Sequence, residues 1–393
     1  MIWPSFVRAG PLEVFVVTLR LGLTSFGGPI AHLGYLRAEY VERRRWLGNA
    51  AFAELVALGQ FLPGPMSSQI GMAVGYVRAG FPGALAGWIG FTLPSALIMA
   101  VFGAIATGGG IDGDEVWLRA LKLVAVAVVL DAVIGMARQL AATWPTALIA
   151  VVAGAVLLVL PTSALAQVAC LIVAAAVGLL LFRSRVGSEP GELPLQIGRR
   201  LGAVALTAFV GLLAVLPLIS GLGVFAALAG ATYRAGALVF GGGHVVLPLL
   251  EAEMVPGLVS ETGFLAGYGV AQALPGPLFT FGTYLGQLAA GLPGAAIATV
   301  AIFLPGALIL FGVLPFWQRI RADARIQAAL VGVNAAVVGL LSAAWIDPIT
   351  ASSMTSVHDA GFAAVLFVAL RFFKAAPWLV VVGALVASPL LAL

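Results

Sequence analysis

The stretch QFLPGPMSSQIG (Gln60–Gly71) interrupts an apolar segment with two prolines around a glycine, followed by two hydroxyls and an amide. A second stretch, QALPGPLFTFG (Gln272–Gly282), repeats this pattern in the other half of the chain. Proline lacks an N–H and suits the first position of a helix, while a Pro-Gly pair before it favours a turn. We therefore expect each LPGP element to end one helix and begin another.

The chain around these breaks is too apolar for a soluble domain. Of its 393 residues, 62% are hydrophobic and 9% are charged, whereas soluble domains carry about 25% charged residues. Apolar windows of about 20 residues cross a bilayer as helices. Such windows are Val116–Gln139, Trp144–Leu160, Ser163–Phe182, Leu201–Ile219, Ala328–Trp345 and Ala375–Leu393. They predict an all-α polytopic membrane protein.

Charge and cysteine content exclude several classes of function. The net charge of +4 comes from Lys and Arg in short loops, which indicates positive-inside topology rather than nucleic-acid binding. The single cysteine, Cys170, permits no intrachain disulfide and cannot build a metal site alone. The chain has no P-loop, zinc-protease motif or redox-thiol pattern. We therefore expect neither an enzyme nor a bound metal or cofactor.

The two halves of the sequence align with each other. FGGPIAHLGYLRAEYV (Phe26–Val41) and FGGGHVVLPLLEAEMV (Phe240–Val255) are identical at eight of sixteen positions, and the LPGP elements follow both in the same order. Collinear order and rare residues together indicate a duplication rather than chance similarity. We expect homologous repeats at residues 1–182 and 221–393, joined at 183–220 by a polar linker and an extra transmembrane helix.

Loop charges indicate that the second repeat is inverted relative to the first. The chain reads LRAEYVERRRWL after the first FGG but LEAEMVPGLVSE after the second, so an arginine-rich loop corresponds to an acidic one. Opposite charge at equivalent loops is typical of inverted-topology repeats. Whether each LPGP element is re-entrant or lies in a broken spanning helix stays open. Spanning helices give antiparallel halves, and re-entrant ones give parallel halves.

The LPGP elements are the first candidate binding site. A helix that starts within the membrane presents free N–H groups and the positive end of its dipole, which together bind anions. The candidate ligand-binding residues are Gly64, Ser67, Ser68 and Gln69 in the first copy, and Gly276 and Thr280 in the second. The alternative is a structural kink, which a single proline-glycine pair in a membrane helix usually represents.

The FGG motifs and two arginines extend this candidate site. Gly27, Gly28, Gly241, Gly242 and Gly243 would let backbone amides approach an anion closely, or would instead permit tight helix packing. Arg20 and Arg234 each lie about two helical turns before an FGG. An arginine in a membrane helix costs roughly 2.5–3.5 kcal/mol, and its guanidinium matches the oxygens of an oxyanion. The alternative for both is a side chain that snorkels to the membrane surface.

Four further residues could exchange protons. His32 and His244 follow the FGG motifs, and histidine titrates near neutral pH. Glu39 and Glu253 occupy equivalent positions in the two halves. The alternatives are a packing role for the histidines and an ion pair between Glu39 and Arg43 at helical spacing.

With these motifs, the chain resembles the chromate ion transporter family in its long, two-domain form. The resemblance rests on TSFGGP (Thr24–Pro29), His32, VERRRWL (Val41–Leu47), the two LPGP elements and FGGGHVVLPLLE (Phe240–Glu251). It implies a multi-pass transporter that exports chromate across the bacterial inner membrane, driven by the proton motive force. It also favours antiparallel halves with a joining helix.

The substrate and the mode of transport leave alternatives. Sulfate has the same shape and charge as chromate, so either oxyanion could be the ligand, with protons as the coupling ion. We expect alternating access around a site at the repeat interface. A passive oxyanion channel and an intramembrane oxyanion-processing enzyme are the alternatives. The oligomeric state stays open, with a homodimer as one option.

Overall fold

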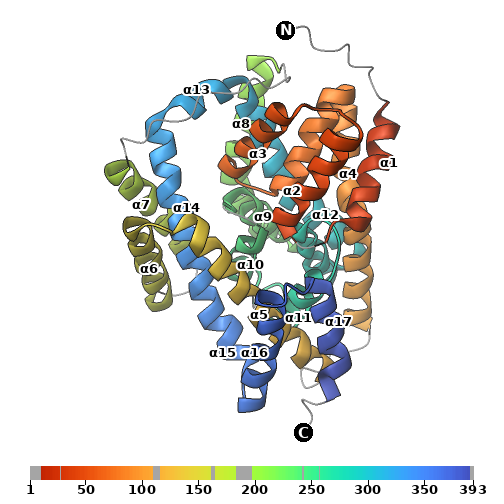
Figure 1. Cartoon of the computed structure of the whole chain (residues 1–393), viewed down its shortest axis with the longest axis vertical. Helices are drawn as coiled ribbons and strands as arrows, with labels where there is room; N and C mark the ends of the chain where they lie inside the picture. Colours follow the sequence, from red (N-terminus) through yellow and green to blue (C-terminus); the bar gives the residue numbers. More distant parts are fainter. Residues whose placement is uncertain are drawn as a thin grey trace.

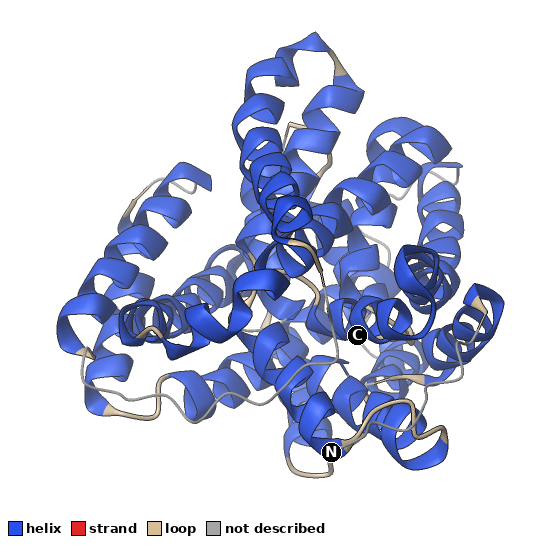
Figure 2. Ribbon diagram, turned by 90° about the horizontal axis from the view of Figure 1, so that it is seen from above, coloured by secondary structure: helices blue, strands red, loops and turns tan. Residues whose placement is uncertain are grey.

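The computed structural model describes residues 10–26, 28–108, 116–160, 164–182, 197–240, 243–255 and 257–389. These residues form helices joined by loops, with no strand among them (Figure 2). Helices long and apolar enough to cross a membrane are Met66–Gly108, Val116–Leu140, Arg199–Leu222, Leu278–Ile320 and Ala324–Ser353. The prediction of an all-α polytopic membrane protein is therefore confirmed.

The first half places its motifs between short helices. α1 (Pro11–Thr24) and α2 (Gly28–Arg37) flank the first FGG, and the π-helix η1 (Ala38–Arg43) continues α2. α3 (Asn49–Phe61) and α4 (Met66–Gly108) flank the first LPGP element. The remaining helices of this half are α5 (Val116–Leu140), α6 (Trp144–Val159) and α7 (Ala164–Leu181). α6 and α7 pack against α14 at the left edge of Figure 1.

The second half repeats the alternation of short helices and motifs. Its elements begin with α8 (Arg199–Ile219), η2 (Ser220–Leu222), α9 (Val224–Leu238), η3 (Gly243–Val245), α10 (Val246–Met254) and α11 (Glu261–Ala271). They continue with η4 (Leu278–Thr280), α12 (Phe281–Val313), η5 (Leu314–Phe316), α13 (Trp317–Ala322) and α14 (Ala324–Ala344). They end with η6 (Trp345–Thr350), α15 (Ala351–Ser353), α16 (Val357–Arg371) and α17 (Pro377–Ala387). α17 ends two residues before Pro389, which has no N–H to extend the helix, and residues 390–393 of the window predicted there lie outside the described residues.

Both LPGP elements interrupt a helix within the apolar bundle. The first separates α3 from α4, and the second separates α11 from η4 and α12. The glycine at the centre of each has a left-handed backbone, with φ of +111° at Gly64 and +98° at Gly276. Side chains with a Cβ rarely adopt such values, so glycine is required at both positions.

α4 and α12 each contain a second break with nearly identical geometry. In α4, Ala79 has φ and ψ of −145° and 24°, and Gly80 has 63° and −153°. In α12, Ala290 has −151° and 27°, and Gly291 has 64° and −159°. Each long element is thus a short leg and a long leg joined by a turn, at nearly the same distance after an LPGP element in both halves.

Glycines bring the two legs of each hairpin into backbone contact. A Cβ on Gly83 would lie 2.1 Å from the carbonyl oxygen of Gly75, and a Cβ on Gly294 would lie 2.3 Å from that of Gly286. Residues eight apart in a straight helix are about 12 Å apart. The legs therefore run antiparallel and side by side, at a separation that only glycine allows.

Each half completes the LPGP element of the other. The amide of Gly64 donates to the carbonyl of Val239 (2.8 Å), and the amide of Gly276 donates to the carbonyl of Ser25 (2.9 Å). Ser25 and Val239 are equivalent in the sequence alignment, each directly before an FGG motif. α4 and α12 also pack against each other. Both breaks therefore lie where the two halves meet.

The short helices of the two halves lie on different sides of the middle of the molecule. α1, α2 and α3 lie in the upper part of Figure 1, whereas α10 and α11 lie in the lower part with α17. α8, which joins the halves, is peripheral: 11% of its apolar window is buried, against 50–61% in the other four long helices. A helix that is apolar and this exposed faces lipid.

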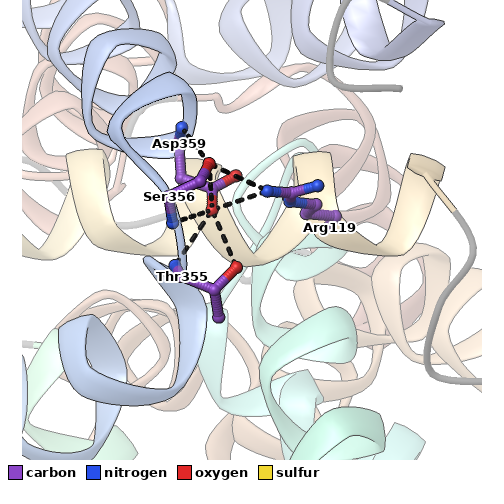
Figure 3. Close-up of polar contacts among 4 residues, drawn as sticks. All are labelled: Arg119, Thr355, Ser356 and Asp359. Carbon is purple, nitrogen blue, oxygen red and sulfur yellow. Dashed lines mark hydrogen bonds and ion pairs between the residues drawn. The ribbon is translucent and has the colours of Figure 1, made fainter. Parts of the chain in front are cut away.

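α5 and α16 are joined at one end of their contact by an ion pair whose carboxylate is buried (Figure 3). Arg119 donates from Nε and Nη2 to the two carboxylate oxygens of Asp359, at 2.6 and 2.8 Å. Asp359 also accepts hydrogen bonds from Thr355 and Ser356, because it forms a capping box with Ser356 at the start of α16. This network fixes the start of α16 against α5.

Candidate functional site

The main candidate site is a cavity of about 510 Å³ where the halves meet. The first LPGP element lines it with Gly64, Pro65, Met66 and Ser67, and the second with Pro277, Leu278 and Phe279. Gly243 and His244 reach it from the second FGG motif, and His32 reaches it from α2. Motifs that lie far apart in the sequence therefore share one internal space.

Helix starts surround this cavity. Met66 and Ser67 are the first residues of α4, and Gly243 begins the helical segment that continues into α10. Gly28, the first residue of α2, lines a smaller adjoining cavity together with Gly276 and His244. The first N–H groups of a helix lack intrahelical partners and carry the positive end of its dipole. Several positive helix ends thus converge on the same space.

His32 is fully engaged with backbone and hydroxyl partners. Its Nε2 lies 3.1 Å from the carbonyl oxygen of Ser25, and its Nδ1 lies 3.0 Å from Oγ of Ser67. A carbonyl only accepts, so Nε2 carries the hydrogen and Nδ1 accepts from the Ser67 hydroxyl. The ring therefore links the first FGG region to the start of α4.

His244 is held from one side and faces the cavity with the other. Its Nδ1 lies 3.0 Å from Oη of Tyr268, a buried side chain on α11. Its Nε2 would lie 3.8 Å from a Cβ on Gly28. If the tyrosine hydroxyl donates to Nδ1, Nε2 carries the hydrogen. That N–H can then serve as a donor to a ligand at the start of α2.

The other polar side chains of the cavity wall come from α3, α5 and α14. They are Gln60, Asp131, Gln139 and Asn334. Asp131 is the one lining residue, among those described, whose side chain is an acid or a lysine or arginine base. Its carboxylate accepts a hydrogen bond from Nη1 of Arg371 at 3.3 Å. The sequence signal for Asp131 and Asn334 was a polar residue within an apolar helix, which by itself indicates only contact between helices.

The structure does not bring the two predicted arginines to the cavity wall. Arg20 is exposed on α1. Arg234 forms a bidentate ion pair with Glu253, in which Nε donates to Oε1 at 2.7 Å and Nη2 donates to Oε2. Neither arginine is among the residues that line either cavity. The two arginines, which align in the sequence, thus have different surroundings: Arg20 is exposed and Arg234 is paired with Glu253.

The predicted proton-carrying glutamates also lie away from the cavity wall. Glu39 accepts from Arg43 at 3.1 Å and from Arg44 at 2.6 Å, which confirms the predicted pair with Arg43. Burial raises the pKa of Glu39, but hydrogen bonds from the two arginines outweigh it and the net pKa is lowered. Glu253 is engaged by Arg234. Of the four candidates, the histidines are the ones that line the cavity.

The remaining predicted residues support the breaks. Nε2 of Gln69 donates to the carbonyls of Pro63 and Gly306, at 2.9 and 3.1 Å, and Thr280 donates to the carbonyl of Pro277. Ser68 is buried, and its Oγ has no hydrogen-bond partner. Gly27, Gly241 and Gly242 lie outside the described residues. No group of three or more His, Cys, Asp and Glu placed to hold a metal ion occurs in the described part of the chain.

Broken helices that meet around an internal cavity with a few polar groups on its wall are typical of membrane transport proteins. Within that class, the chain belongs to the chromate transporter family: the family model described as "Chromate transporter" matches residues 12–180 and 226–388. This is a family of membrane transport proteins rather than of enzymes.

Several curated relatives cover most of the chain. A "Chromate transport protein" of Cupriavidus metallidurans is 32% identical over 397 residues, which cover 96% of this chain and 94% of the relative. A "Probable chromate transport protein" of Synechococcus elongatus is 29% identical, with 87% and 84% covered. A "Chromate transport protein" of Pseudomonas aeruginosa is 30% identical, with 85% and 80% covered. No solved structure matches the chain.

Proposed function

We propose that this protein is a secondary transporter that exports chromate across the bacterial inner membrane and binds the oxyanion in the cavity between its halves. The observation that carries the proposal is the convergence of both LPGP elements, the second FGG region and both histidines on one cavity. The names of the relatives supply chromate as the substrate class. Sulfate, with the same shape and charge, is a second substrate.

The donors around the cavity suit a tetrahedral dianion. The amides at the starts of α2, α4 and η3 supply N–H groups, and Gln60, Gln139 and Asn334 supply side-chain amides. Nε2 of His244 adds a donor that faces Gly28. Oriented backbone N–H groups bind an oxyanion without a formal positive charge. Such a site also releases its ligand more readily than an arginine pair would, which transport requires.

The electrical part of the proton motive force favours export of a dianion. Moving one elementary charge across 100 mV changes the free energy by about 2.3 kcal/mol, so a dianion gains about 4.6 kcal/mol on leaving a negative interior. Proton exchange at His32 and His244 would add the chemical part. Protonated His32 would donate from Nδ1 to Ser67, which frees the serine hydroxyl to donate to the oxyanion.

The halves are proposed to be inverted repeats that alternate in opening the cavity to the two sides. Three features support this: equivalent glycine turns in α4 and α12, reciprocal hydrogen bonds at the LPGP elements, and the opposite placement of α1–α3 and α10–α11. A site at the interface between two such repeats is exposed to one side at a time when one repeat moves against the other.

Flux into liposomes that contain the purified protein tests the proposal. Radiolabelled chromate and sulfate are offered with an imposed membrane potential, with a pH gradient, and with neither. We expect uptake against a concentration gradient toward the positive interior, with a further effect of the pH gradient. Flux that never exceeds equilibration would instead indicate a passive channel. Chemical change of chromate during the assay would indicate an oxyanion-processing enzyme.

A further inference from the structure

The anion cavity has a carboxylate on its wall. Asp131 on α5 lines both the main cavity and the smaller cavity beside Gly28 and His244. Its side chain is 36% exposed, so the charge is not sealed away from the cavity. Like charges at short range in a protein interior repel strongly. An ionised Asp131 with no partner would therefore oppose the entry of any oxyanion.

Arg371 forms an ion pair with this carboxylate from outside the cavity lining. It is the last residue of α16, and its Nη1 lies 3.3 Å from Oδ1 of Asp131. Arg371 is not among the residues that line either cavity. Arg371 donates to Asp131, and His244 lies near enough to interact with its charge. The guanidinium thus offsets the charge of Asp131 without itself offering a ligand to the oxyanion.

The chain supplies a matched second pair on the same two helices. Arg119 and Asp359 join the start of α5 to the start of α16, and Asp131 and Arg371 join the same helices twelve residues further along both. Twelve residues of helix span about 18 Å. The first pair lies away from the cavity and the second lies at its wall. Both hold α5 against α16, but the charge of one alone acts on the cavity.

We propose that the Asp131–Arg371 ion pair sets the charge of the oxyanion cavity, with Arg371 as a positioning residue that holds Asp131 neutralised so that a dianion can bind. This inference rests on the proposed function of the cavity. It has a distinctive signature, because a change of one unit charge acts twice as strongly on a dianion as on a monoanion. A merely structural role would change the binding of both anions alike.

Binding of chromate and of perrhenate tests this signature. Both are tetrahedral oxometalate anions, and chromate is the dianion at mildly alkaline pH. Arg371→Gln should weaken chromate binding by about tenfold and perrhenate binding by about threefold, the square root of that factor. Asp131→Asn should strengthen chromate binding by about tenfold and perrhenate binding by about threefold. The double variant Asp131→Asn/Arg371→Gln should return both affinities to within about threefold of the wild type.

Arg119→Gln is the control, since it breaks the matching pair away from the cavity. It should leave the ratio of chromate to perrhenate affinity unchanged even if the protein becomes less stable. Equal weakening of the two anions in Arg371→Gln, or unchanged affinities in Asp131→Asn, would overturn the inference. Asp131→Asn provides this test even if Arg371→Gln does not fold. Wild-type protein that binds neither anion would overturn the proposed function, and this inference with it.

Discussion

Gly64 has a left-handed backbone conformation, and its amide donates a hydrogen bond to Val239 in the other half of the molecule. Gly276 has the same conformation, and its amide donates to Ser25 in the first half. The sequence predicted the local part of this geometry, because proline and glycine restrict the backbone by themselves. It could not predict the partners, Val239 and Ser25, since these depend on how the halves pack. Glycine is therefore needed at both positions for two separate reasons: backbone conformation and close approach.

Replacing either glycine with alanine should destabilise the protein and impair transport. A Cβ on Gly64 would lie 3.0 Å from Cα of Gly306, and one on Gly276 would lie 2.9 Å from Oγ of Ser95. We expect a loss of about 1–3 kcal/mol of stability from the backbone strain alone. Thermal unfolding in detergent and flux in liposomes measure the two effects. Gly361→Ala in α16 is the control, because no heavy atom lies within 4 Å of its Cβ.

Charged residues illustrate where inference from sequence ends. Arg20 and Arg234 were predicted to bind the oxyanion because they recur at equivalent positions, but the structure places both away from the cavity wall. In the sequence, Asp131 is only a polar residue within an apolar helix. Its place on the wall depends on the packing of α5 against α11, α14 and α16, which no local pattern encodes. Charge and spacing identify unusual residues, but tertiary contacts decide what those residues face.

At the scale of elements, the helix pair α5 and α16 shows how a membrane bundle fixes its geometry with few polar contacts. Burial raises the pKa of Asp359, but hydrogen bonds from Arg119, Thr355 and Ser356 outweigh it and hold the pKa at about 2. Arg119 is 35% exposed and Asp359 is fully buried. The buried carboxylate of Asp359 is therefore paired with an arginine whose side chain stays partly exposed.

Asp359→Asn should cost about 1.5–3 kcal/mol of stability at neutral pH, the range for hydrogen bonds to charged groups. Since the folded pKa lies below the unfolded value of about 3.9, the contribution is present above that pH. It is lost as the pH falls toward about 2. Unfolding temperatures of wild type and variant should therefore converge on acidification.

Glu42→Gln serves as the control for this series. Glu42 pairs with Arg37, and both side chains are at least half exposed. Exposed ion pairs contribute little to stability, so this variant should unfold like the wild type at every pH. A difference between wild type and Asp359→Asn that stays constant down to the lowest pH would contradict the assigned role of the carboxylate.

At the scale of the whole molecule, the sequence predicted the class of fold and the sites of helix breaks, because these follow from composition and from proline and glycine. It did not predict the hairpins inside α4 and α12. Their turns, at Ala79–Gly80 and Ala290–Gly291, lie in the matching segments AGFPG (79–83) and AGLPG (290–294). Glycine and proline mark a break in such a segment, but they do not distinguish a kinked helix from a full turn between antiparallel legs.

Inverted halves predict opposite membrane sides for equivalent loops. Glu42 lies in the arginine-rich segment after α2, and Gly257 lies in the acidic segment after α10; both are exposed. In a Cys170→Ala background, Glu42→Cys should react with an impermeant thiol reagent only from the cytoplasmic side. Gly257→Cys should react only from the opposite side. Labelling of both from the same side would exclude an inverted arrangement.

The reciprocal hydrogen bonds at Gly64 and Gly276 also constrain how the chain matures. Until the ribosome has made the second half, Val239 is absent and the amide of Gly64 has no hydrogen-bond acceptor there. An unpaired amide is costly in the bilayer. The N-terminal half should therefore remain a substrate for insertion chaperones and membrane proteases until its counterpart arrives. A truncated chain that ends in the linker should be degraded rapidly, and co-expression of the missing half should rescue it.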